Sequence, residues 1–171
     1  MPTLVCILSD THGVLDPRVA ALAASCDLVV HGGDVGNAAV LAALGGDNGR
    51  LVAVRGNNDV ARKWPAADTE TLAALPARAE LALPGGRLAV EHGHRVNPAS
   101  RRHAALRQRH PQARAVVYGH SHRLVCDLDA EPWILNPGAA GRSRTFGGPS
   151  CLLLRAGLRV WQVEPRRFSP R

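Results

Sequence analysis

The segment LVCILSDTH (residues 4–12) decides the fold of this chain, because a short apolar run ends there in an aspartate and a histidine. Such a run, closed by polar turn residues, is typical of a buried strand. Apolar runs followed by polar side chains recur at residues 28–34, 51–59, 87–94 and 115–122. Ligands of open α/β sheets bind beyond the carboxyl ends of the strands, so we expect the polar groups to share one edge.

Helix signals separate the first three of these runs. Asp16-Pro17 is a typical N-cap and first helical residue, and it predicts a helix directly after the first strand. Asn37 is expected to cap a second helix, which Gly45-Gly46 ends. The order strand, helix, strand, helix, strand favours parallel pairing with right-handed crossovers.

The second half of the chain is richer in strand signals. A Pro84-Gly85-Gly86 turn between two apolar runs predicts a β-hairpin. Residues 98–110 predict a helix on which His103 and His110 are expected to face solvent, and residues 62–76 predict a short helix or an ordered loop. Further strands are expected at residues 115–118, 124–127, 133–135, 151–154 and 158–163.

These elements predict an α/β protein, a four-layer α/β-β/α sandwich in which two mixed sheets pack face to face and helices cover their outer surfaces. A length of 171 residues suits one domain that buries a real core. We expect this single domain to occupy residues 1–164, and residues 165–171 to form a frayed C-terminal tail.

Composition narrows the classes of function. The formal net charge of +7 suits a nucleic-acid surface, but Lys63 is the only lysine and the arginines are scattered outside residues 101–109. This arginine bias is typical of GC-rich coding, so nucleic acid is not expected as the primary partner.

No apolar run is long enough for a bilayer and the N-terminus lacks a secretory pattern, which favours a cytoplasmic protein. The four cysteines form no Cys-x-x-Cys pair and are expected to be buried, reduced thiols.

Five short motifs carry the chemistry, and together they supply carboxylate, amide and imidazole groups but no thiol. Oxygen and nitrogen donors suit Mn²⁺, Fe or Zn²⁺ better than Cu(I) or an iron–sulfur cluster. Two divalent ions that share a carboxylate, about 3.5–4 Å apart, are typical of sites that hydrolyse phosphate esters. The motifs are Asp10-x-His12, Gly33-Asp34, Gly56-Asn57-Asn58-Asp59, His92-Gly93-His94 and Gly119-His120-Ser121-His122.

In order and spacing these motifs resemble the calcineurin-like metallophosphoesterases, above all their small, minimal bacterial and archaeal members. Asn136-Pro137-Gly138 resembles a further motif of that subgroup. The resemblance implies hydrolysis of phosphodiesters, with monoesters as further substrates, by a hydroxide that bridges two divalent ions. Mn²⁺ is the expected metal, with Fe, Zn or Ni as alternatives. The resemblance implies one ion on Asp10, His12, Asp34 and His122, and a second on Asp34, Asn57, His92 and His120, with Asp34 as the bridge.

Asn58 departs from the pattern of many phosphomonoesterases in the superfamily, which have a histidine after the metal-binding Asn. An amide can donate a hydrogen bond to a phosphate oxygen but cannot act as a general acid near neutral pH. His94 is expected near the substrate, and Asp59 is expected to orient its own loop. Arg142 and Arg144 are suited to holding a phosphate, although a solvated loop is an equal alternative.

A rival function comes from a different class of protein. The retromer scaffold subunit has the same fold and binds proteins through a domain whose metal centre is impaired. Here all seven expected ligand positions carry competent side chains, which favours an enzyme whose partner is a small phosphate ester. His31 is expected to be a satisfied core histidine rather than a partner of the site. The sequence leaves the physiological substrate and a homo-oligomeric state open.

Overall fold

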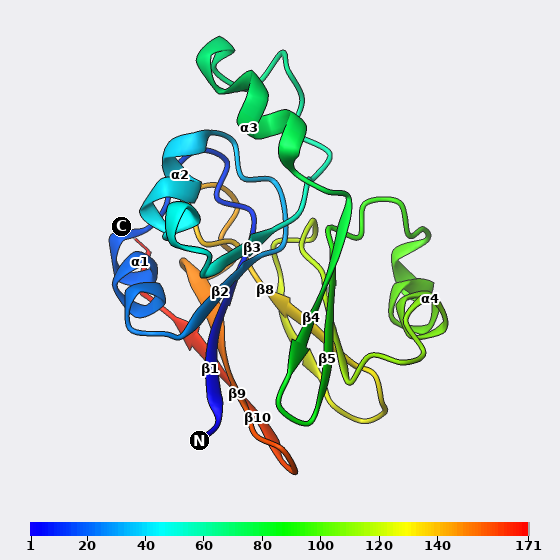
Figure 1. The fold of residues 1–171 in the computed structure, drawn as a ribbon. Coiled ribbons are helices and arrows are strands. Elements are labelled where there is room, and N and C mark those ends of the chain that lie inside the picture. The colour runs from blue at the N-terminus through cyan, green and yellow to red at the C-terminus, as the bar shows by residue number, and fades with distance from the viewer. Residues whose placement is uncertain (171) are drawn as a thin grey trace.

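The structure is a computed structural model that describes residues 1–170 (Figure 1). Short 3₁₀ turns lie at Gly46–Asn48, Ala66–Asp68 and Ala99–Arg101. In chain order the remaining elements are β1 (Thr3–Leu8), α1 (Pro17–Ala24), β2 (Leu28–His31), α2 (Ala38–Ala43), β3 (Leu51–Ala53), α3 (Thr69–Ala74), β4 (Arg78–Leu83), β5 (Gly86–Glu91), α4 (Arg102–Arg109), β6 (Ala115–Val117), β7 (Leu124–Asp127), β8 (Trp133–Pro137), β9 (Ser150–Ala156) and β10 (Trp161–Arg167).

Two mixed five-stranded sheets form the centre of the molecule. The first has the order β10-β9-β1-β2-β3, in which β1, β2 and β3 run parallel and β9 runs antiparallel to both of its neighbours, β1 and β10. The second has the order β4-β5-β6-β8-β7, in which β5, β6 and β8 run parallel and the two edge strands antiparallel. This confirms the predicted class of fold.

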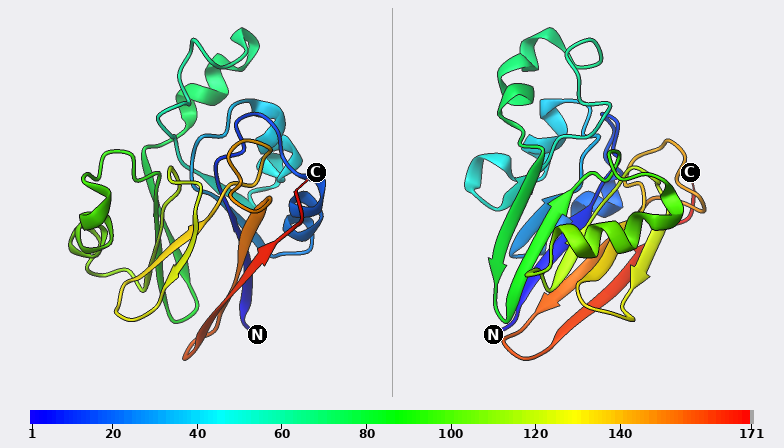
Figure 2. Two further views of the ribbon diagram at one scale, coloured as in Figure 1. Left: turned by 180° about the vertical axis from the view of Figure 1, so that it is seen from behind. Right: turned by 90° about the vertical axis from the view of Figure 1, so that its right-hand side faces the viewer.

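Alternation along the strands creates the layers. In β1, Val5 and Ile7 pack between the two sheets, whereas Cys6 and Leu8 pack outward against the helical layer that α1 and α2 form. On the far side, Leu106 of α4 covers the second sheet. Figure 2 shows α4 on the opposite side of the molecule from α1 and α2, as a four-layer sandwich requires. Within residues 1–170, no helix is long and apolar enough to cross a membrane.

The predicted helix caps are confirmed. Asp16 Oδ1 accepts a hydrogen bond from the backbone N–H of Arg18 at 2.9 Å, and Pro17 begins α1. Asn37 Oδ1 accepts from the backbone N–H of Val40 at 3.0 Å and begins α2. Each cap satisfies an N–H group that has no partner inside its helix.

The C-terminal tail is not frayed as predicted. Strand β10 begins at Trp161, later than expected, and continues to Arg167, which lies opposite Ser150 of β9. Beyond it, the backbone N–H of Phe168 donates to Pro149 O at 2.8 Å. Pro165 fits in this strand because β10 is at the edge of its sheet, where a missing N–H costs little. The final residue of the predicted tail, Arg171, lies outside the described residues.

The two histidines of α4 do not face solvent as predicted. His110 is buried, and its Nε2 lies 2.7 Å from Glu91 Oε1 of β5. His103 Nδ1 lies 2.7 Å from Asp127 Oδ2 of β7. Both side chains therefore attach α4 to the second sheet through carboxylates that lie far away in the sequence. The cysteines follow expectation except for Cys126, which is partly exposed.

We expect Asp127→Asn to lower the free energy of unfolding by about 1 kcal/mol at pH 7, because this carboxylate also accepts a 2.7 Å hydrogen bond from Arg107. That bond holds the pKa of Asp127 below its usual range. Because the folded-state pKa is depressed, the contribution is complete above the unfolded pKa of about 3.9 and is lost as the pH falls through the lower folded value.

Urea denaturation of wild type and Asp127→Asn, at pH 7 and at strongly acid pH, measures this difference in the free energy of unfolding. Asp129→Asn is the matched control, because Asp129 is exposed and no ion pair involves it within residues 1–170. A difference between wild type and Asp127→Asn that stays constant across the pH range would contradict the prediction.

Candidate metal centre

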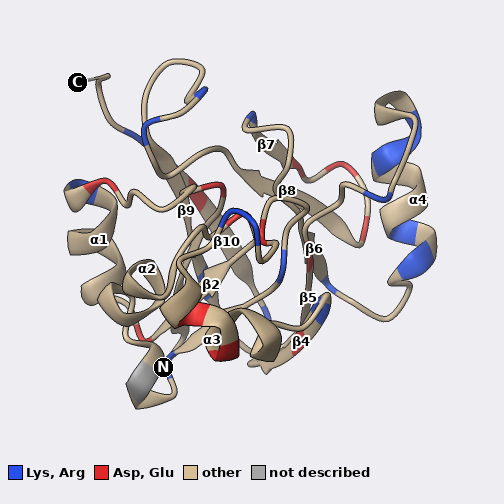
Figure 3. Ribbon diagram, turned by 90° about the horizontal axis from the view of Figure 1, so that it is seen from above, with Lys and Arg blue, Asp and Glu red and all other residues tan. Residues whose placement is uncertain are grey.

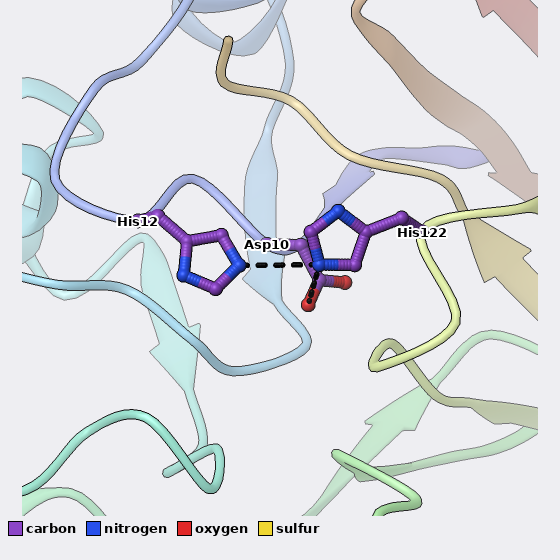
Figure 4. A group of neighbouring side chains, drawn as sticks. All are labelled: Asp10, His12 and His122. Carbon is purple, nitrogen blue, oxygen red and sulfur yellow. Dashed lines mark hydrogen bonds and ion pairs between the residues drawn. The ribbon is translucent and has the colours of Figure 1, made fainter. Parts of the chain in front are cut away.

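The predicted ligands converge at the carboxyl edge of both sheets. Asp10 follows β1, Asp34 follows β2 and Asn57 follows β3, all in the first sheet. His92 follows β5, and the segment with His120 and His122 follows β6, both in the second sheet. Figure 4 shows His12 and His122 approaching Asp10 from opposite sides. The centre thus lies across the junction of the two sheets.

The backbone at this edge is strained. Positive φ angles are uncommon for residues other than glycine and cost of order 1–3 kcal/mol each, so they persist only where the surroundings enforce them. Hydrogen bonds from the backbone N–H groups of Asp10 and His12 to Gly33 O and Asp34 O, at 3.0 and 2.9 Å, hold the first two loops together. Among the predicted ligands, positive φ angles occur at Asp10 (55°), His12 (48°), Asp34 (55°), His120 (66°) and His122 (58°).

The first ligand cluster consists of Asp10, His12 and His122, whose ligand atoms all lie within 4.8 Å of one another. His122 Nε2 is 3.1 Å from His12 Nε2 and 3.4 Å from Asp10 Oδ1. Burial lowers the pKa of both histidines, that of His122 to about 4, so both rings are neutral near pH 7. In the neutral His122 ring, Nδ1 donates to Ser143 O at 3.1 Å and leaves a lone pair on Nε2.

Asp10 supplies the test of whether a cation fits. Its Oδ1 atom is buried and has no hydrogen-bond partner within residues 1–170. Burial raises the pKa of Asp10 to about 7, because nothing on the chain fully compensates its negative charge. A buried oxygen without a partner is costly unless a ligand satisfies it. The groups around Asp10 Oδ1 are carboxylate oxygens and imidazole nitrogens, which are the donors that a divalent cation requires. The residues therefore fit a metal ion.

The second ligand cluster consists of Asp10, Asp34 and His92. His92 Nδ1 donates to Gly32 O at 2.8 Å, so Nε2 is the atom that faces the site. Burial opposes protonation of His92, but the hydrogen bond from Nε2 to Asp34 outweighs it and raises the pKa of His92, so Nε2 has a lone pair for a metal only once this proton is lost. His92 Nε2 lies 3.3 Å from Asp34 Oδ2 and 3.2 Å from Asn57 Oδ1, and Asn57 Oδ1 is 3.0 Å from His120 Nδ1. Asp34 and Asp10 connect this cluster to the first, as a bridged pair of ions would require.

Asp34 is held in its ionised form. Burial opposes ionisation, but the hydrogen bonds from His92 and Asn58 outweigh it and keep the pKa of Asp34 below its usual range. Asn58 donates twice, from its backbone N–H to Oδ1 at 2.8 Å and from Nδ2 to Oδ2 at 2.6 Å. The amide donor of Asn58, expected to point at a phosphate, thus faces this carboxylate.

Lys63 is a site residue that sequence reasoning missed. Its ammonium group donates to Asn58 Oδ1 and lines a hollow of about 300 Å³ together with His12 and Asp34. The sequence did contain a signal for this residue, because the only lysine of the chain lies five residues after Asn58. The side chain adds a positive charge next to the ionised carboxylate.

Asp59 orients the loops that hold two ligands, in agreement with the sequence interpretation. Its buried carboxylate accepts hydrogen bonds from the backbone N–H groups of Gly56 at 2.8 Å, Val35 at 3.2 Å and Gly36 at 3.0 Å. Trp64 Nε1 adds a fourth at 2.9 Å. Gly56 is required here, because a Cβ atom at that position would lie 2.1 Å from Asp34 Oδ1.

The remaining predicted residues differ in their proximity to the clusters. The His94 ring lies 5.5 Å from the His92 ring, and its buried Nδ1 has no hydrogen-bond partner within residues 1–170. Arg144 Nη2 donates to His122 Nε2 at 3.0 Å, which places a cation beside the first cluster. Arg142 is exposed, and within the described chain no contact links it to either cluster.

Two further side chains support the site from behind. His31 is fully buried and satisfied, as expected, with its Nδ1 accepting from Gly33 N–H at 3.2 Å and its Nε2 lying 2.9 Å from Thr11 Oγ1. Both contacts are to loops that carry predicted ligands, so His31 is also a partner of the site, which the sequence interpretation did not favour. Asn136 donates from Nδ2 to Gly119 O at 2.8 Å and to Ser121 Oγ at 3.0 Å. The late Asn-Pro-Gly motif therefore stabilises the loop that carries His120.

Comparison with known proteins decides the family. A sequence model of the calcineurin-like phosphoesterase superfamily domain matches residues 4–157. The chain belongs to this superfamily. Among proteins with curated functions, none matches the chain.

Several solved structures share the fold of this chain. Yfce, a phosphoesterase from E. coli, is 24% identical with a TM-score of 0.63, and the match covers 96% of this chain and 98% of that one. An archaeal phosphodiesterase is 20% identical with a TM-score of 0.70, covering 95% and 99%. Vps29 from Entamoeba histolytica, in complex with zinc, is 20% identical with a TM-score of 0.70, covering 97% and 98%. The calcineurin-like fold thus serves both esterases and Vps29.

Proposed function

We propose that this protein is a dinuclear metal-dependent phosphoesterase that hydrolyses phosphodiesters. The observation that carries the proposal is the buried, unpartnered Oδ1 of Asp10, which lies where two clusters of carboxylate and imidazole ligands meet. Membership of the calcineurin-like superfamily supports it. We also propose that its substrate is a small phosphate ester and that it acts in the cytoplasm.

Seven side chains would hold the two ions, in the arrangement that the family implies. When bound, such ions supply an activated water and neutralise charge on the phosphoryl oxygens. Mn²⁺ is our first choice of metal, with Fe, Zn and Ni as alternatives. The first ion would use Asp10, His12, Asp34 and His122, and the second Asp34, Asn57, His92 and His120.

The surrounding side chains would orient and polarise the substrate. Arg144 lies beside the first cluster and can pair with a phosphoryl oxygen. Asn58 keeps Asp34 ionised and in place, and Lys63 adds positive charge on the same side. His94 lies beside the second cluster with a free ring nitrogen and is the candidate donor to the substrate on that side. Asn58 itself cannot supply a proton to a leaving group near neutral pH.

Metal content tests the proposal directly. We expect about two manganese ions per chain after loading and desalting, because the family implies two neighbouring ions that both bind Asp34. Elemental analysis measures this without any substrate. Asp34→Ala should lose both ions, whereas the exposed Asp129→Ala should retain them. A wild-type value near zero would end the enzyme hypothesis.

A scaffold function is the second candidate, and the likeness to Vps29 favours it. A scaffold of this fold would bind a protein partner and need no turnover. Hydrolysis of bis(p-nitrophenyl) phosphate by the manganese-loaded protein separates the two functions. Activity that Asp34→Ala abolishes supports the esterase, and metal binding without any turnover supports the scaffold.

A further inference from the structure

A second hollow opens beside the proposed second metal site, and the ligands occupy only one edge of it. It has a volume of about 830 Å³ and lies between the loop after β3, helix α3 and the loop after β5. His92, Asn57 and His94 form its inner edge. Small-molecule sites are typically clefts of about 300–1,000 Å³, so the hollow accommodates far more than a phosphate group.

Helix α3 and the loop before it form an apolar wall of this hollow. Val60, Leu72 and Ala73 present apolar surface to it, and Leu72 is buried against the core. The Arg55 guanidinium donates to Leu72 O at 2.6 Å and to Ala73 O at 3.3 Å. These bonds satisfy carbonyls at the end of α3 and fix the helix to the loop after β3, so the wall is formed before a ligand arrives.

The charge exposed in the hollow is positive. Its two acidic residues are buried and satisfied, Asp59 by backbone N–H groups and Glu91 by Arg109 and His110 at 2.7 Å each. Arg78 and Arg95 are exposed at the rim, and Arg95 has no hydrogen-bond or ion-pair partner within residues 1–170.

The acidic side chains near the hollow do not offset this charge. Figure 3 shows acidic positions on and before α3. Neither Asp68 nor Glu70 lines the hollow, and Asp68 accepts a hydrogen bond from the backbone N–H of Ala38 at 2.9 Å. An anion that enters the hollow therefore meets free arginine and no free carboxylate.

We propose that this hollow binds the retained arm of the phosphodiester, and that the preferred arm is bulky and carries a further phosphate. The inference rests on the proposed function and names its class of substrate. The apolar body of the arm packs against Val60 and Leu72, and its phosphate pairs with Arg95, whose planar fork matches phosphate oxygens. Hydrolysis adds water across the scissile P–O bond, so the leaving alcohol departs and the retained arm keeps both phosphates.

A matched pair of esters tests this. Thymidine 5′-(p-nitrophenyl phosphate) is compared with the same compound bearing a 3′-phosphate, so the scissile bond and the leaving group are identical. We expect the manganese-loaded protein to show a KM about 10-fold lower for the 3′-phosphorylated ester at similar kcat, as one charge-assisted contact provides. Arg95→Ala should remove this preference and leave the KM of the other ester unchanged. Arg101→Ala, an exposed arginine that does not line the hollow, should keep it.

Product binding gives a readout that needs no turnover. Calorimetric titration should show thymidine 3′,5′-bisphosphate binding about 10-fold more tightly than thymidine 5′-monophosphate in wild type, and equally in Arg95→Ala. Equal binding of the two nucleotides by wild type, or a preference that survives Arg95→Ala, would overturn the inference. In either case, turnover of bis(p-nitrophenyl) phosphate reports separately on the proposed esterase function.

Discussion

Asp34→Asn should lower kcat by more than about 100-fold, beyond the range expected for residues that only orient metal ligands. Asn has nearly the shape of Asp but no charge, and Asp34, the proposed bridge, contacts His12 of the first cluster at 3.8 Å and His92 of the second at 3.3 Å. Kinetics on a nitrophenyl diester at saturating Mn²⁺ measure the loss. Asn57→Ala should lose less activity, because its side chain is placed in the second cluster alone.

The control for this prediction is His31→Ala, which should cost about 10- to 100-fold at most. His31 touches Thr11 and Gly33 but neither carboxylate, so it supports the ligand loops from behind. Circular dichroism must first show that each variant is folded, since His31 is fully buried. If folded His31→Ala were more impaired than Asp34→Asn, the assignment of Asp34 as the bridge would be wrong.

Asn58→His removes the Nδ2 bond to Asp34, so its effect is measured as a ratio: the rate on esters with strongly basic leaving groups should rise by about 10²–10⁴-fold relative to the rate on aryl diesters, the usual contribution of a positioned general acid. In wild type the leaving oxygen departs without a proton from Asn58, so the rate should fall steeply as the leaving group becomes more basic. Aryl diesters should therefore react well and simple alkyl monoesters poorly. A series of esters graded by the basicity of the leaving group, run on both proteins, measures the two slopes.

A flat dependence in wild type would mean that another residue already donates the proton. His94 is the first suspect, since its ring adjoins the second cluster and its Nδ1 is free. Lys63 is the second, since its ammonium group reaches Asn58. Repeating the series on His94→Ala and Lys63→Met would show which residue is responsible, because only loss of the true donor restores a steep slope.

Local signals in the sequence were sufficient for the fold. The apolar run of β1, the Asp16 and Asn37 caps and the Pro-Gly-Gly turn depend on neighbours within a few residues, and the structure has all of them. The end of β10 was not predictable in this way, because pairing with β9, rather than local hydropathy, carries that strand past Pro165. The orientation of His110 likewise depends on Glu91, a partner 19 positions away.

The candidate site was predictable as a set of residues but not as a geometry. The order of the motifs placed Asp10 and His122 in one site, and the structure brings Oδ1 of the former to 3.4 Å from Nε2 of the latter. Nothing in the sequence indicated the left-handed backbone at these positions or the two bonds from Asn58 to Asp34. Those features depend on how loops from distant strands meet.

The division of the ligands between two sheets has a consequence for how the protein matures. Asp10 and His122 are 112 positions apart, and β1 itself pairs with β9, which follows His122 in the chain. Contacts between such distant parts of a chain form late and slowly during folding. A polypeptide in which the two sheets have not yet packed together therefore offers only part of the candidate ligand set, so both proposed ions could bind only after the two halves of the fold have met.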